Sequence, residues 1–84
     1  DISALFQSLF GKSPDRIEKI PQSGSDRIYF RIYSSDSSYI ATYNLHQKET
    51  QTFIYFSEHF KKAGLPVPAI YGVNDKNTIY IQED

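Results

Sequence analysis

The sequence predicts an α+β fold: a five-stranded antiparallel sheet in the order β-β-β-α-β-β, one main covering helix and an extra N-terminal helix. Two stretches carry apolar residues at helical spacing, and several short segments alternate apolar and polar side chains. Turns rich in Ser, Asn and Asp separate these segments. Strands joined by such short turns pair antiparallel, and the main helix lies between the third and fourth strands.

The N-terminal helix is expected over residues 2–10 and ends at Gly11. Its apolar residues fit the i, i+3, i+4, i+7, i+8 pattern: Ile2, Leu5, Phe6, Leu9 and Phe10. A helix of about nine residues is not stable alone in water. We therefore expect it to pack on this domain, or on another chain or domain.

The main helix is expected in the stretch 48–68, where three phenylalanines share one face and Ile54 widens the stripe: Phe53, Phe56 and Phe60. This stripe is expected to cover the sheet. Gly64 supplies a left-handed stop, and the prolines that follow it prevent continuation. Glu49 lies one turn before the stripe, at its inner side or margin, so its carboxylate needs a partner or a function.

Five strands are expected, at residues 16–22, 27–34, 39–43, 69–73 and 78–82. The first two form a hairpin around the turn 23–26, and a second polar turn covers 34–38. Pro21 interrupts the first strand, which indicates an edge strand because proline cannot donate to a neighbour.

Length and composition limit the possible functions. Residues 1–84 make a single domain. Nine basic and ten acidic residues give a net charge of −1, which argues against a nucleic-acid partner. No apolar run approaches the ~20 residues of a membrane span, and the lack of a signal-peptide pattern favours the cytoplasm. The chain ends directly after its last strand, so we expect further residues to follow in the natural protein.

The residues give no independent sign of hydrolytic or metal chemistry. Cysteine is absent, which excludes disulfides and thiolate metal sites. His46 and His59 are too far apart for an i, i+4 metal pair on the helix. The glutamates show no paired acid and base arrangement.

Four segments resemble the N-terminal lobe of the aminoglycoside phosphotransferase and choline kinase family, which has a protein-kinase-like fold. The chain is most similar to the bacterial amino-sugar kinases within it. The segments are Gly-Ser-Asp-Arg-Ile-Tyr-Phe-Arg at 24–31, Glu49 to Phe53, Gly-Leu-Pro-Val-Pro at 64–68 and Tyr-Ile-Gln-Glu-Asp at 80–84. The helix at 2–10 lies outside the shared part.

The resemblance implies the ATP-binding lobe of a phosphotransferase acting on a hydroxyl of a sugar, aminoglycoside or choline-like acceptor. The family's catalytic aspartate and magnesium ligands have no match here, so Mg²⁺ would be held mainly by a second lobe and this lobe alone would be inactive. Its exposed aromatic surface would favour self-association. The alternative is a non-catalytic protein-interaction or regulatory module.

The resemblance also implies positions for the nucleotide. The first hairpin would cover the phosphates through Ser23, Gly24, Ser25 and Arg27. The family's third strand carries a lysine that pairs with the helix glutamate. Here Thr42 stands at the lysine position and Glu49 matches the glutamate. Arg31 is a candidate for the missing cation, and Arg27 and Arg31 are both candidates for the partner of Glu49.

The base would lie at the other end of the sheet, where the resemblance places the hinge between the two lobes. Ile40, together with Val67, would cover the adenine ring with apolar contacts. Backbone groups of Gln82, Glu83 and Asp84 would bind the adenine edge. Because main-chain contacts place little demand on side-chain type, the residues at 82–84 do not test this expectation.

Overall fold

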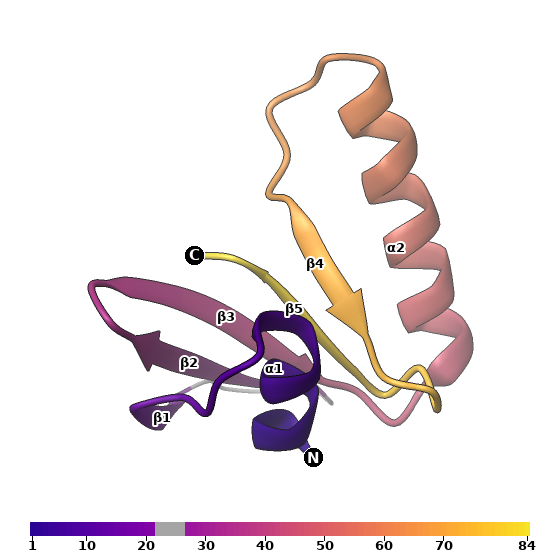
Figure 1. The fold of residues 1–84 in the computed structure, drawn as a ribbon. Coiled ribbons are helices and arrows are strands. Elements are labelled where there is room, and N and C mark those ends of the chain that lie inside the picture. The colour runs from indigo at the N-terminus through magenta and orange to yellow at the C-terminus, as the bar shows by residue number, and fades with distance from the viewer. Residues whose placement is uncertain (22–26) are drawn as a thin grey trace.

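The computed structural model describes residues 1–21 and 27–84 and confirms the α+β layout of two helices and a five-stranded antiparallel sheet (Figure 1). The predicted turn at 23–26 lies outside the described residues. The elements are α1 (Ile2–Phe10), β1 (Arg16–Ile20), β2 (Ile28–Ser34), β3 (Ser37–Tyr43), α2 (Gln47–Lys62), β4 (Ile70–Val73) and β5 (Ile79–Glu83).

The sheet has the strand order β1-β2-β3-β5-β4, and every neighbouring pair is antiparallel. β1 is an edge strand, as Pro21 predicted. β3 begins at Ser37, two residues earlier than expected. The polar turn needs only Ser35 and Asp36, because Ser35 adopts a left-handed conformation (φ 56°) that reverses the chain tightly.

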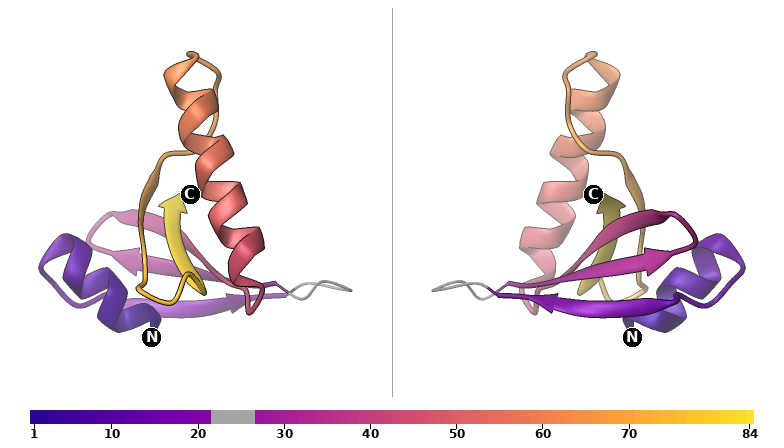
Figure 2. Two further views of the ribbon diagram at one scale, coloured as in Figure 1. Left: turned by 90° about the vertical axis from the view of Figure 1, so that its right-hand side faces the viewer. Right: turned by 90° about the vertical axis from the view of Figure 1, so that its left-hand side faces the viewer.

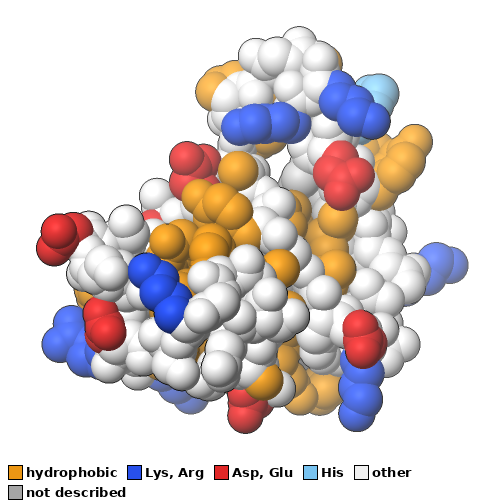
Figure 3. All heavy atoms as spheres, viewed as in Figure 1, with side chains coloured by type: hydrophobic (Ala, Val, Ile, Leu, Met, Phe, Trp, Pro, Cys, Tyr) orange, Lys and Arg blue, Asp and Glu red, His pale blue; other side chains and the backbone are white. Residues whose placement is uncertain are grey.

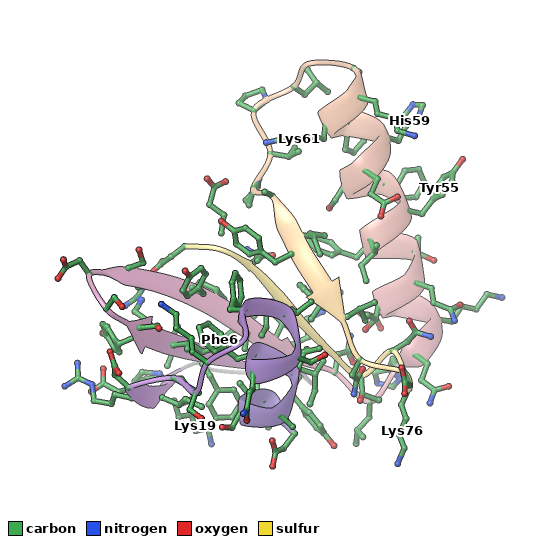
Figure 4. The ribbon with its side chains drawn as sticks, in the orientation of Figure 1. Phe6, Lys19, Tyr55, His59, Lys61 and Lys76 are labelled. Carbon is green, nitrogen blue, oxygen red and sulfur yellow. The ribbon has the colours of Figure 1, made fainter. Side chains whose placement is uncertain are left out.

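The hydrophobic core lies between α1 and one face of the sheet. Ile32, Ala41 and Ile81 lie on that face and are fully buried together with Phe6 of α1. Phe6 lies between α1 and the sheet (Figure 4), and its ring is 4.6 Å from that of Phe10 between centroids. The N-terminal helix therefore packs on this domain, which was one of the alternatives that its short length left open.

The prediction that the phenylalanine stripe of α2 covers the sheet holds only for Phe53, whose ring stacks on that of Tyr80 in β5. Phe53, Phe56 and Phe60 are 38%, 47% and 40% exposed. The side of α2 that faces inward carries buried Thr50 and, over the next two turns, half-buried Ile54 and Ser57. The reason is that α1 already occupies the apolar face of the sheet, so α2 packs elsewhere.

α2 stands beside β4 and β5, and its C-terminal half extends past the sheet together with the 63–69 connection (Figures 1 and 2). Its N-terminal half packs on the strands, where the ring of Phe53 stacks on the ring of Tyr80 at 5.1 Å. Tyr55 and His59 point away from the strands (Figure 4). Hydrophobic side chains therefore reach the surface over α2 and β4 (Figure 3).

The end of α2 follows the sequence closely. Gly64 has φ 83° and donates its N–H to the carbonyl of Lys61 at 3.1 Å. The N–H of Leu65 reaches back to the carbonyl of Phe60 at 3.0 Å. These two bonds form a Schellman motif, which confirms the predicted glycine stop.

Candidate functional site

The face of the sheet opposite α1, here called the far face, carries the candidate site residues. Side chains alternate across a strand, so the neighbours of the core residues in β2, β3 and β5 point to this face. The strand register aligns them in two cross-strand rows. The rows are Tyr29, Thr42 and Tyr80, and then Arg31, Ile40 and Gln82.

Arg27 and Glu49 form an ion pair where the start of β2 meets the first turn of α2, with 2.5 Å between Nη2 and Oε1. Arg27, and not Arg31, is therefore the partner of Glu49. The two side chains are 38% and 51% exposed. Partial burial lowers the pKa of Arg27, but hydrogen bonds with Tyr29 and Glu49 outweigh it and raise the pKa above its usual value. Glu49 also suits the positive end of the helix dipole.

Thr42, which the resemblance places at the position of the family's lysine, is almost fully buried (1% exposed). It lies between Tyr29 and Tyr80 on the neighbouring strands. Burial raises the pKa of Tyr80, and the neighbouring Thr42 hydroxyl opposes that shift. The charge of Arg27 also acts on Tyr80. The group formed by these residues, called the Arg27 cluster below, consists of Arg27, Tyr29, Thr42, Glu49 and Tyr80.

An open hollow of about 610 Å³ lies against the Arg27–Glu49 pair. Its lining is rich in basic groups at the N-terminal end of α2: Arg27, His46, Lys48, Glu49, Thr52 and Phe53. A helix N-terminus with cations around it favours an anionic ligand. The hollow therefore combines a helix N-terminus with the cations Arg27 and Lys48, and Glu49 offsets part of their charge.

Arg31 lies at the other end of the far face, about 13 Å along the strand from Arg27 at four residues of ~3.3 Å each. Its guanidinium binds the carboxylate of Asp84 through two contacts, at 2.9 and 3.4 Å. The hydroxyl of Ser38 donates to the same carboxylate at 2.6 Å. Ser38, and then Arg31, lower the pKa of Asp84, against the opposing effect of partial burial.

The end of β5 is held by its neighbours. The N–H of Glu83 donates to the carbonyl of Ala69 at 2.8 Å, and the Glu83 carboxylate accepts from the Ala69 N–H at 3.1 Å. Backbone groups of residues 82–84 were predicted to bind the adenine edge, but the N–H of Glu83 already donates to the carbonyl of Ala69. Ile40 is half-buried beside Gln82, where the resemblance places the base.

Some predicted groups are not placed. Ser23, Gly24 and Ser25 lie outside the described residues. Within residues 1–21 and 27–84, no three or more His, Cys, Asp or Glu side chains gather as a metal site would require. The sequence did not indicate the binding of Asp84 by Arg31 and Ser38, because these residues are far apart in the chain. Only the strand register brings them together.

Comparisons with known proteins add no identification: no family model and no curated protein matched this chain. The family resemblance therefore stays a prediction that depends on the residues quoted for it. Neither helix in the described part of the chain has the length and apolar character to cross a membrane.

Proposed function

We propose that the chain is the nucleotide-binding lobe of an ATP-dependent small-molecule phosphotransferase of the aminoglycoside phosphotransferase and choline kinase type. The observation that carries this proposal is the ion pair between Arg27 and Glu49. In this fold a cation and a helix glutamate form a pair beside the nucleotide phosphates. The element order, three strands, a helix and two strands, supports the same reading.

In this proposal the nucleotide lies along the far face of the sheet. The phosphates lie at the Arg27 end, beside the hollow and the N-terminus of α2. The base lies toward Ile40 and the end of β5. Because the Glu83 N–H already donates to the carbonyl of Ala69, other main-chain groups near the end of β5 bind the edge of the base in this proposal.

Phosphoryl transfer needs groups that this lobe does not supply. In the proposal, a second lobe provides the catalytic aspartate and most of the Mg²⁺ ligands, and it binds the acceptor hydroxyl of a sugar, aminoglycoside or choline-like molecule. The 84 residues alone then bind nucleotide weakly and transfer nothing. We place the activity in the cytoplasm.

A second candidate function is that of an interaction module, because α2 exposes a row of aromatic side chains. Phe56 and Phe60 stack at 6.1 Å between centroids, and both are at least 40% exposed. Tyr55, on another side of the helix, is 66% exposed. Such a surface favours self-association or a protein partner. Sedimentation at increasing concentration tests this, and a monomer throughout would remove the argument for self-association.

ATP binding by the natural protein that contains this chain tests the phosphotransferase proposal. Calorimetry with ATP and Mg²⁺ should show binding, and Glu49→Ala should weaken it. Glu58→Ala makes the same charge change on α2 without touching Arg27, so it should leave binding unchanged. Phosphate transfer from ATP is then assayed with amino sugars, aminoglycosides and choline as acceptors. Absence of ATP binding by the wild-type protein would overturn the proposal.

A further inference from the structure

The cation that the resemblance places on the third strand cannot come from Thr42 itself. The Thr42 side chain is short, uncharged and 1% exposed, and it lies between Tyr29 and Tyr80. A phosphate at this place would meet a buried hydroxyl instead of an ammonium group. If a nucleotide binds here, its negative charge must be balanced by another residue.

Arg31 is poorly suited to this role. Like Arg27, it binds a carboxylate, in this case that of Asp84 through Nε and Nη2, so the two arginines differ in position and not in pairing. Arg31 lies about 13 Å from Arg27 along the strand direction, away from Glu49 and the hollow. Arg31 fixes the end of β5 to β2 and β3, a role that needs no ligand.

Arg27 has the required position. It lies at the edge of the far face and binds Glu49 in the first turn of α2. Its side chain is 38% exposed and lines the hollow at the helix N-terminus. A guanidinium presents five N–H donors in a fixed fork, so a single arginine can hold a carboxylate and a phosphate at the same time.

We propose that Arg27, oriented by Glu49, replaces the family's strand lysine as the residue that recognises the phosphate chain of the nucleotide. This inference rests on the proposed function. It makes Arg27 a specificity-determining residue: it favours a nucleoside triphosphate over the bare nucleoside and leaves recognition of the base unchanged. Because arginine stays charged at every physiological pH, this preference has no upper pH limit of its own.

The test compares ATP with adenosine as ligands of the natural protein, since only ATP carries phosphates. Dissociation constants are measured by calorimetry for the wild type, Arg27→Ala, Arg27→Lys and Arg31→Ala. Arg31→Ala is the matched control, because it removes the same charge four residues further along the chain, away from Glu49 and the hollow. Arg27→Ala should weaken ATP binding roughly ten-fold, as expected for one lost charge-assisted contact. Adenosine binding should change less than about two-fold.

Arg27→Lys should keep part of the ATP preference, since it retains the charge and loses the fork. Arg31→Ala should leave the ratio of the ATP and adenosine affinities as in the wild type. Should Arg27→Ala not fold, as judged by circular dichroism, Arg27→Gln keeps most of the side-chain length and decides the same comparison.

The outcomes separate the two proposals. A wild-type protein that binds neither ATP nor adenosine overturns the proposed function. A wild-type protein that binds ATP, with an Arg27→Ala variant of unchanged ATP-to-adenosine ratio, overturns the inference alone. An equal loss of affinity for ATP and adenosine in Arg27→Ala also overturns the inference, because Arg27 would then maintain the fold of the site and would not bind the phosphates.

Discussion

Replacing Phe6 by alanine should destabilise the domain far more than replacing Phe56 by alanine. Phe6 is fully buried and packs against the rings of Phe10 and Tyr39 at 4.6 and 5.3 Å. Truncation of a buried phenylalanine costs about 3–5 kcal/mol. Phe56 is 47% exposed, and its ring contacts are with Tyr55 and Phe60 on its own helix. Its loss should cost under about 1 kcal/mol.

The comparison is made by urea unfolding followed by circular dichroism. A domain of 84 residues has a total stability of roughly 4–13 kcal/mol, so Phe6→Ala can remove most of it. Phe6→Leu is the milder variant that keeps a folded baseline measurable. The midpoint should fall in the order wild type, Phe56→Ala, Phe6→Leu, Phe6→Ala. A loss for Phe56→Ala as large as for Phe6→Ala would show that the core lies under α2 and would refute the reasoning.

Three further predictions concern local features. Gly72→Ala should destabilise by about 1 kcal/mol, because the new Cβ would lie 2.5 Å from a methyl group of Leu9, and this side chain, 36% exposed, can move only by giving up its present packing. The cost should shrink in a Leu9→Ala background, as a double-mutant cycle in urea would show. Gly64→Ala should cost about 1–2 kcal/mol in the same assay, since φ is 83° there, whereas an unchanged midpoint would contradict the left-handed stop. Because the pKa of Asp84 is lower in the folded protein than its ordinary value of 3.8, its carboxylate stabilises the fold above pH 3.8, and this stability is lost as pH falls through the folded value. In a pH series, Ser38→Ala should make the decrease of the melting temperature at acid pH smaller. An unchanged decrease would exclude the contact with Ser38 as its cause.

The elements could be predicted because each carries a local signal. The apolar spacing in residues 2–10, the alternation in 28–34 and the stop at Gly64 all depend on near neighbours in the chain. No local signal in the sequence shows which surface each helix packs against. The phenylalanine stripe of α2 identifies an apolar side, but periodicity does not say which helix takes the sheet. α1 covers the apolar face of the sheet through Phe6, and Phe56 and Phe60 of α2 are left exposed.

The candidate site could be predicted in part. Glu49 was singled out because a carboxylate beside an aromatic stripe needs a partner, and the structure supplies one. The choice of Arg27 over Arg31 depends on strand register and on where α2 begins, which are long-range properties. The ion pair joins residues 22 positions apart, and the contact between Arg31 and Asp84 joins residues 53 positions apart. Residue types within a short window do not determine such pairs.

The way in which α2 is attached decides how the Arg27 experiments should be read. Thr50 is buried, and Phe53 stacks on Tyr80, so packing fixes the N-terminal half of the helix on the sheet. The Arg27–Glu49 pair is 38% and 51% exposed, and an ion pair in such a setting contributes about 0–1 kcal/mol. Removing Arg27 therefore changes the charge beside the hollow while α2 stays in place. A large loss of ATP affinity with little loss of stability would then have to arise at the ligand, because the fold does not depend on the pair.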